Sequence, residues 1–251
     1  MRYITPDKIL RMRFQDAPRP HWDAAILCFR DLTGSRAVVA ELGAAPTGQR
    51  ALWGKYEFPG DPHVFELRIG EHLVAVVGQC LWGGPQASIF VEELASLGAR
   101  YLVGIGCAGA LAADLPMGGQ IVATAGLTTD GASRAYTDEP EVTADPDLTA
   151  AALEAARACG VEPYPVRVAT VDAIYRETDA AVRAWTASGA HVVNMETTPF
   201  YAASDACGVS SLWIGHLSDR VVQEAWEEWG GHEHAVPVTA RIAFETLKRI
   251  L

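Results

Sequence analysis

Short runs of apolar residues alternate with stretches of helical pattern along the whole chain, and this alternation restricts the possible folds most strongly. The run at 72–77, His-Leu-Val-Ala-Val-Val, carries no polar alternation, as expected of a strand covered on both faces. No linker-like change of composition divides the chain, so we expect one α/β domain spanning residues 1–251. Strands are predicted at 22–29, 64–69, 72–77, 101–105, 120–125, 166–171, 192–193 and 211–215, and helices at 6–13, 35–42, 85–97, 147–159, 180–188, 199–207 and 237–251.

Charge and cysteine usage exclude several classes of function. The 31 acidic and 20 basic side chains give a net charge of -11, whereas nucleic acids and anionic membranes require a basic face. The five cysteines are far apart and form no CxxC pair, which argues against disulfides or zinc and favours a reducing cytoplasm. His232 and His234 are two positions apart in a glycine-rich segment, and this spacing is only a weak signal for a metal site. With no signal-peptide core and no apolar run of membrane-spanning length, we expect a cytoplasmic protein that binds small molecules.

The segment 191–201, His-Val-Val-Asn-Met-Glu-Thr-Thr-Pro-Phe-Tyr, places a carboxylate between a strand and a helix. Pro199 fits the first turn of that helix, so Glu196 lies at the strand end, where α/β proteins hold ligands. An ionised carboxylate only accepts hydrogen bonds, which suits a ligand with adjacent hydroxyls, such as ribose. The alternative is that Glu196 only interacts favourably with the helix dipole.

A GxGxxG motif, Gly104-Ile-Gly-Cys-Ala-Gly109, follows the strand at 101–105. A dinucleotide site requires this motif to open a long helix, yet the next residues run into Pro116-Met-Gly-Gly119 after about one and a half turns. The context therefore argues against the dinucleotide interpretation, and a nicotinamide oxidoreductase would require the Gly104 turn to open a long helix. Close strand packing accounts for Gly104, and the amides of Gly106 and Cys107 remain candidates for a small anion-binding nest.

Two further turns follow predicted strands. In Gly78-Gln-Cys-Leu-Trp-Gly-Gly-Pro85 the glycines let a ligand approach the backbone and Trp82 offers a flat face, although a plain turn with a core tryptophan also fits. In His216-Leu-Ser-Asp-Arg220, Asp219 follows a strand on the same side of the sheet as Glu196, although Ser218 or Asp219 is also a possible helix cap. Two carboxylates that converge there can divide the work, one orienting a sugar and the other protonating a leaving base.

Taken in order, these motifs resemble the nucleoside phosphorylase family, which contains purine nucleoside and uridine phosphorylases and nucleosidases. The similarity covers most of the chain and is best from Val74 to Asp219. It implies a three-layer αβα domain around a central mixed, partly barrel-like sheet. The matching motifs are Gly83-Gly-Pro-Gln-Ala-Ser-Ile-Phe-Val-Glu-Glu-Leu94, Gly104-Ile-Gly-Cys-Ala-Gly-Ala110 as the phosphate-side turn, Asp130-Gly-Ala-Ser133 with Tyr136, Thr170-Val-Asp-Ala-Ile-Tyr175, Val193-Asn-Met-Glu196 and Ser218-Asp219.

The resemblance implies a role for each matching residue. Glu196 would bind the ribose hydroxyls, Met195, beside Asn194 in the same motif, would contact the sugar face, and Asp219 would protonate the leaving base. An anionic nucleophile, usually inorganic phosphate, would stabilise an oxocarbenium-like transition state, and no other cofactor is implied. A neighbouring subunit would lend Arg50 to the phosphate, which implies a homo-oligomer, either a dimer or a trimer of dimers. The residues placed beside the base are Trp82, Ile174 and Tyr175.

The chain also departs from the family pattern. The usual Gly-Asp-Pro-x-x-Arg loop is replaced by residues 28–36, where Arg30 or Arg36 is left to supply the charge. Gly104 stands where the family has an arginine that binds phosphate, and Cys107 stands where the family has a serine or threonine hydroxyl. Losing a bidentate arginine removes a contact worth about 1.5–3 kcal/mol. The Gln/Arg pair that binds uracil is missing after Tyr175, which favours a purine or a modified base.

We therefore predict cleavage of the N-glycosidic bond of a nucleoside, by phosphorolysis to free base and ribose 1-phosphate. A nucleosidase that uses water, or a nucleoside-binding protein without activity, is the alternative.

Overall fold

The computed structural model describes residues 2–15, 17–47, 52, 64–80, 82–222 and 225–251. Within them, every strand and helix predicted from the sequence is present, and the hairpin at 64–77 has the predicted bounds. The strands are β1 (Ala24–Cys28), β2 (Ala45–Pro46), β3 (Val64–Ile69), β4 (His72–Val77), β5 (Tyr101–Ala110), β6 (Gln120–Leu127), β7 (Glu141–Thr143), β8 (Tyr164–Thr170), β9 (Val192–Asn194), β10 (Ser210–Val222) and β11 (Ala225–Glu228). The α-helices are α1 (Pro6–Phe14), α2 (Leu32–Leu42), α3 (Gly84–Ser96), α4 (Pro146–Ala158), α5 (Asp179–Ala187), α6 (Thr197–Cys207) and α7 (His232–Ile250), and two short 3₁₀ turns are η1 (Ser133–Ala135) and η2 (Ile174–Arg176).

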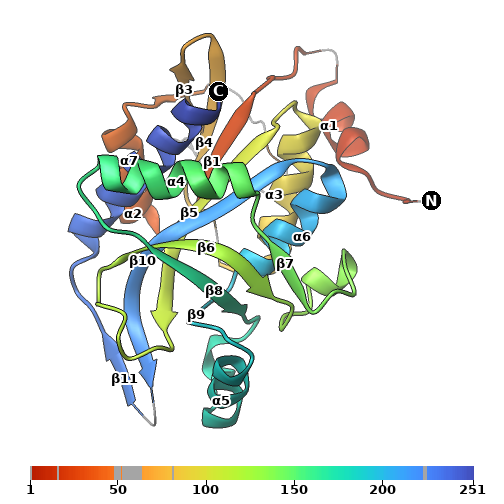
Figure 1. The fold of residues 1–251 in the computed structure, drawn as a ribbon. Helices are drawn as coiled ribbons and strands as arrows, with labels where there is room; N and C mark the ends of the chain where they lie inside the picture. Colours follow the sequence, from red (N-terminus) through yellow and green to blue (C-terminus); the bar gives the residue numbers. More distant parts are fainter. Residues whose placement is uncertain (1, 16, 48–51, 53–63, 81, 223–224) are drawn as a thin grey trace.

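One mixed sheet runs through the described residues, and part of it closes on itself. The strand order is β11-β10-β6-β8-β9-β5-β1-β4-β3-β2, and an additional parallel pairing joins β10 to β5. This pairing closes the strands β10, β6, β8, β9 and β5 into a barrel, while β1, β4, β3 and β2 extend from it as an open sheet (Figure 1). The central mixed, partly barrel-like sheet is thus as expected.

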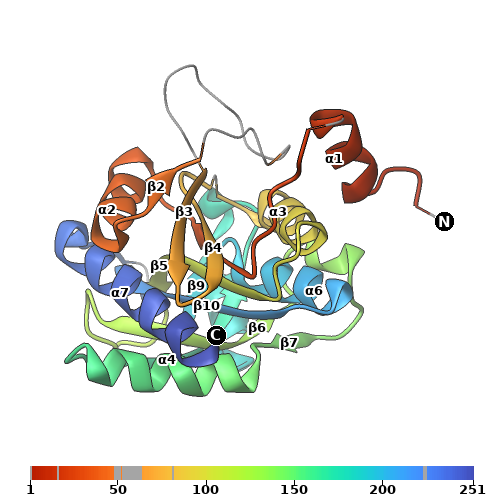
Figure 2. The same ribbon diagram turned by 90° about the horizontal axis from the view of Figure 1, so that it is seen from above.

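Helices cover both faces of the sheet and complete the three layers. On one face α7 packs between α4 and α2, and on the other α3 packs against α6, with α1 beyond α3 (Figure 2). The strands between them are almost fully apolar; all five residues of β1, for example, are buried. The remaining helix, α5, lies beside the end of β9, away from the open part of the sheet (Figure 1). Of the helices in the described residues, none has both the length and the apolar character needed to cross a membrane.

The two strands that close the barrel are longer than predicted. The expected turn at Gly104–Ala110 is a continuous part of β5, and β10 continues past Gly215 to Val222. The glycines that look like strand breakers make room for Trp213: a Cβ at Gly104 or Gly106 would lie 2.8 or 2.7 Å from its ring, and one at Gly215 would lie 2.6 Å from it. The interpretation of Gly104 as a close-packing residue therefore holds, and the motif opens no helix.

Two helix starts also differ from the prediction. Asp145, not Asp147, caps α4, since its carboxylate accepts hydrogen bonds from the amides of Asp147 and Leu148. The last helix begins at His232 rather than at Pro237, so the proline lies inside α7. A proline marks a helix start in most sequences because it lacks the amide that an interior position needs. Here the helix extends one further turn toward β11.

Candidate active site

Glu196 lies at the junction between β9 and α6, as predicted, and is almost fully buried. Its side chain does not cap α6. Instead, Oε1 accepts a hydrogen bond from the backbone amide of Gly83, at 3.0 Å, in the turn before α3. Burial raises the pKa of Glu196 to about 7, although the Gly83 and Met195 amides favour the ionised form. The side chain of Asn194 holds the junction itself, since Oδ1 accepts from the amides of Glu196 and Thr197 at 3.3 and 3.2 Å.

The prediction that Asp219 follows a strand is wrong. Asp219 lies within β10, just past a bulge between Leu217 and Asp219. Neither Ser218 nor Asp219 caps a helix, because both belong to this strand. Ser218 Oγ donates to Asp219 Oδ1 at 2.5 Å, and the indole N–H of Trp226 on β11 donates to Oδ2 at 3.1 Å. Gly109 on β5 leaves room for this carboxylate, since a Cβ there would lie 2.9 Å from Oδ2. The Asp219 carboxylate is therefore surrounded by Ser218, Trp226 and the backbone at Gly109.

Cys107 on β5 links the two carboxylates. Burial raises the pKa of its thiol, and the negative charges of Glu196 and Asp219 both raise it further. Strand pairing agrees with this, since Asp219 and Val193, three residues before Glu196, both pair with Gly109 on β5, two residues from Cys107. Arg30, which follows β1, approaches from another side: its Nη1 donates to Cys107 Sγ at 2.6 Å and its charge lowers the pKa of the thiol. Two carboxylates, a thiol and a guanidinium thus gather around the middle of β5.

The three residues expected beside the base are exposed. Trp82 is 68% exposed, Ile174 51% and Tyr175 98%. Trp82 directly precedes Gly83, the residue that binds Glu196, whereas the other two lie in η2. Met195 is half-buried and packs against a small apolar cluster that contains Val171 and Val193. Their contact with a base or a sugar stays a prediction.

The arginines expected to bind phosphate are placed differently from one another. Arg30 is half-buried beside Cys107. Arg36 is exposed on α2 and makes no ion pair within the described part of the chain. Arg50 lies outside the described residues. The expected nest at Gly106 and Cys107 is not formed, because both residues are in the extended strand β5, where successive amides point in opposite directions. A phosphate role for these two residues stays a prediction, through a single amide or the thiol.

Four residues near the site were not singled out as site residues from the sequence. Trp226 contacts Asp219, and Glu177, after η2, has its pKa raised to about 7 by burial and by the charge of Asp219. His216 is fully buried, its pKa is lowered to about 3, mainly by burial, and its Nε2 lies 3.0 Å from Nδ1 of His232. A histidine inside an apolar strand is the one usable signal, because buried ionisable groups require a partner. Trp226 and Glu177 carry no comparable signal.

His232 and His234 do not share a site. His232 contacts His216, whereas the side chain of His234 is 85% exposed and pairs only with Glu233, at 3.7 Å. Across the residues that the structure describes, no three histidine, cysteine or acidic side chains are grouped as metal ligands.

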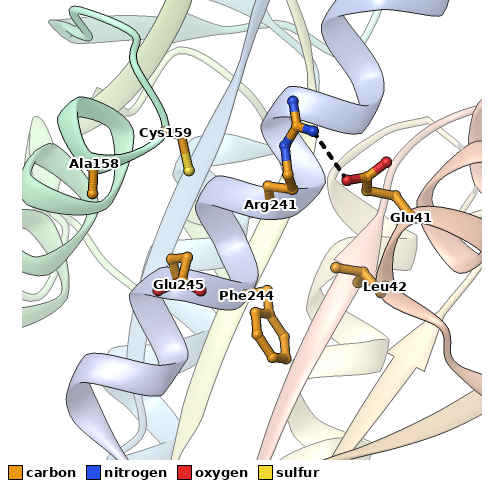
Figure 3. A pocket seen from close by; sticks show the side chains of 7 residues that line it. All are labelled: Glu41, Leu42, Ala158, Cys159, Arg241, Phe244 and Glu245. Atoms are coloured by element: carbon orange, nitrogen blue, oxygen red, sulfur yellow. Dashed lines mark ion pairs between the residues drawn. The ribbon is translucent and has the colours of Figure 1, made fainter.

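A surface pocket of about 390 Å³ lies elsewhere, between α2, α4 and α7 (Figure 3). Phe244 and Cys159 line it, and an ion pair between Arg241 and Glu41, with 3.3 Å between Nη1 and Oε1, spans one side. Neither carboxylate of the site described above takes part in it.

Comparisons with known proteins identify the family of this chain. Residues 36–250 match the model of the family described as the phosphorylase superfamily. The uridine phosphorylase of Haemophilus influenzae is 30% identical over 158 residues, which cover 57% of this chain and 63% of that protein. The uridine phosphorylase of Escherichia coli K12 is 29% identical over 191 residues, 67% of this chain and 73% of that protein. The guanosine phosphorylase of Halorubrum lacusprofundi is 32% identical over 142 residues, 56% of this chain and 58% of that protein.

Proposed function

This chain belongs to the phosphorylase superfamily, and from this premise we propose that it cleaves the N-glycosidic bond of a nucleoside with inorganic phosphate as the nucleophile. The observation that carries the proposal is that the segments of Glu196 and Asp219 meet at Gly109 of β5, two residues from Cys107. One carboxylate is deeply buried beside an amide of a glycine turn, and the other is held on a strand by Ser218 and Trp226. Such a pair suits a ligand that needs a sugar contact and a proton donor in one place.

The proposed reaction divides the work between the two acids. Glu196 accepts hydrogen bonds from the ribose hydroxyls, with Met195 against the sugar. As the bond from C1′ to the base nitrogen breaks, its electron pair goes to the base, and Asp219 delivers the proton that neutralises the leaving base. A phosphate oxygen then forms the new bond to C1′ of the oxocarbenium-like sugar. The products are the free base and ribose 1-phosphate.

A purine or a modified base is the proposed leaving group. The proposal assigns to Asp219 the protonation of a ring nitrogen of a purine, and the hydrogen bond from Ser218 to Oδ1 supports it by orienting the carboxyl group. The chain has Arg176-Glu177-Thr178 where a uracil-binding Gln/Arg pair is expected, and Glu177 lies near Asp219. Of the relatives named above, two are uridine phosphorylases and one is a guanosine phosphorylase, so the base has to be tested directly.

Hydrolysis is a second candidate, favoured by one observation. At Gly104, where the family pattern has a phosphate-binding arginine, Trp213 occupies the space that a side chain would need. A site with fewer positive charges holds a phosphate less strongly, and water needs no such charge. The assembly also remains a proposal: a homo-oligomer in the cytoplasm in which a neighbouring subunit lends Arg50.

The test is release of free base from a panel of purine, pyrimidine and modified nucleosides, each incubated with the protein with and without inorganic phosphate. We expect release of a purine or modified base only when phosphate is present, together with ribose 1-phosphate. Equal release without phosphate would mean hydrolysis, and tight nucleoside binding without release would mean a binding protein without activity. Glu196→Gln serves as the control for a contaminating enzyme.

A further inference from the structure

His216 lies directly beside Cys107, on the side of β5 that pairs with β10 and not on the side that pairs with β9. The parallel pairing of β10 with β5 places His216 opposite Cys107, so both side chains are neighbours on one face of the sheet. His216 is fully buried, and its Nε2 lies 3.0 Å from Nδ1 of His232 at the start of α7. Trp229 packs against both rings, with centroids 6.1 and 5.7 Å away, and fixes the pair in place.

Two buried polar atoms of this cluster have no hydrogen-bond partner among the residues that the structure describes. They are Nδ1 of His216 and Nε of Arg30. Arg30 also forms no ion pair with the described residues, although Nη1 contacts the thiol of Cys107. Buried donors without a partner, and a half-buried guanidinium without a counter-ion, cost free energy that a bound ligand would recover. Arg30 and His216 both lie against Cys107, the first through the contact of Nη1 with Sγ at 2.6 Å and the second through strand register.

The first turn of α7 points to the same kind of ligand. The helix begins at His232, and its N-cap residue, Gly231, provides no side chain to bond the free amides. A long helix with open amides at its N-terminus favours an anion. The acidic groups whose charges reach His232 are Asp31, Asp219 and Glu228, and the opposing cation is Arg30.

We propose that Arg30, His216 and His232 form an anion subsite that holds the attacking phosphate beside Cys107. The imidazole pair then supplies a hydrogen-bond donor to the anion, while Arg30 supplies the positive charge. If His232 Nδ1–H donates to His216 Nε2, the remaining His216 Nδ1–H is free to donate to a phosphate oxygen, and Arg30 donates to another. This inference rests on the proposed function, because it names the residues that receive its nucleophile.

The experiment measures binding of inorganic phosphate to the full chain by isothermal titration calorimetry, and the KM for phosphate where base is released. We expect Arg30→Gln to weaken phosphate binding about 10- to 100-fold and His232→Gln about tenfold, with the KM for the nucleoside nearly unchanged. His234→Gln is the matched control, two residues further along α7 and exposed, and it should bind phosphate within about twofold of the unmodified protein. Because His216 is fully buried, His216→Asn is measured only after circular dichroism shows a native fold; if it does not fold, the His232 and Arg30 variants decide.

Each outcome separates the subsite from the reaction. Wild-type phosphate binding by His232→Gln and Arg30→Gln, or no phosphate binding by the unmodified protein, would overturn the subsite. Base release that needs phosphate, with an unchanged KM for phosphate in both variants, would leave the proposed function standing without the subsite. If the variants bind phosphate more weakly but the unmodified protein releases no base, the subsite would stand and the proposed function would not.

Discussion

The backbone amide of Gly83 donates to Oε1 of Glu196 at 3.0 Å and so ties the turn before α3 to the junction between β9 and α6. The two residues are 113 positions apart in the chain. Gly83 has φ +109°, a conformation that residues with a side chain rarely adopt, so this contact depends on glycine. The amides of Gly83 and Met195 together hold the Glu196 carboxylate at this junction.

Glu196→Gln should therefore abolish most of the turnover without unfolding the protein. The side-chain oxygen of glutamine can still accept a hydrogen bond from the Gly83 amide. The negative charge, whose hydrogen bonds to the sugar would strengthen in the transition state, is lost. We expect kcat/KM for the best nucleoside to fall about 100-fold or more, as measured by release of free base. Near-normal turnover in this variant would remove the ribose assignment.

The same substitution should raise stability at alkaline pH. Burial raises the pKa of Glu196 from its ordinary value of 4.5 to about 7, so the folded state holds this proton more tightly than the unfolded state. The free energy of unfolding of the unmodified protein therefore falls as pH rises from about 4.5 through about 7, and glutamine does not titrate. Urea denaturation should show similar stability at pH 4.5 and a gain of roughly 2–3 kcal/mol for Glu196→Gln at pH 8. Glu177 titrates in both proteins, so its contribution cancels in the difference; identical curves at pH 8 would contradict the burial of the charge.

Trp226→Phe should lower turnover through Asp219. The substitution keeps an aromatic ring but removes the N–H that donates to Asp219 Oδ2 at 3.1 Å. Losing one hydrogen bond to a carboxylate costs about 1–1.5 kcal/mol, so we expect kcat to fall about tenfold with a smaller change in KM. A double-mutant cycle with Asp219→Asn checks the route, because the Trp226 effect should vanish when the carboxylate is absent. An equal loss in both backgrounds would mean that Trp226 acts independently of Asp219.

Gly109→Ala should displace the same carboxylate from the opposite side. A Cβ at this position would lie 2.9 Å from Asp219 Oδ2 and 3.3 Å from Val193 Cγ1. We expect kcat to fall about tenfold, while the free energy of unfolding falls by about 1–2 kcal/mol. Gly230→Ala is the matched control, since a Cβ there meets nothing within 4 Å. Unchanged turnover in Gly109→Ala would show that turnover does not depend on the position of the Asp219 carboxylate.

Local sequence patterns were sufficient for most of the fold. The hairpin of β3 and β4 is visible because two apolar runs flank a Gly-Glu turn, and Thr5-Pro6 marks the start of α1 through an ordinary cap. The full lengths of β5 and β10 were not visible, because the glycines at 104, 106 and 215 look like breaks until Trp213 is known to pack on them. Pairing between residues more than 100 positions apart, which closes the barrel, leaves no local signal.

Both candidate acids are named from the sequence, and their roles stay predictions, whereas most residues around them are not named. Glu196 and Asp219 stand at sequence positions that a strand-to-helix reading and a family resemblance both mark. Cys107 was noticed as a missing hydroxyl and as part of a possible anion nest, whereas in the structure its thiol contacts Arg30. Trp226 and His216 reach the site only through strand pairing across the barrel, and such contacts follow from register rather than from composition.

The packing of Trp213 on Gly104 also limits how this protein can change. The single substitution Gly104→Arg would place Cβ 2.8 Å from Trp213 Cδ1 and 3.3 Å from Phe29 Cε2, inside a filled core. An arginine at 104 is tolerable only after residue 213 has become smaller, whereas a smaller residue at 213 alone would leave a cavity behind three glycines. Both single steps are thus disfavoured and the pair is strongly epistatic, so Trp213 restricts which residues position 104 can accept.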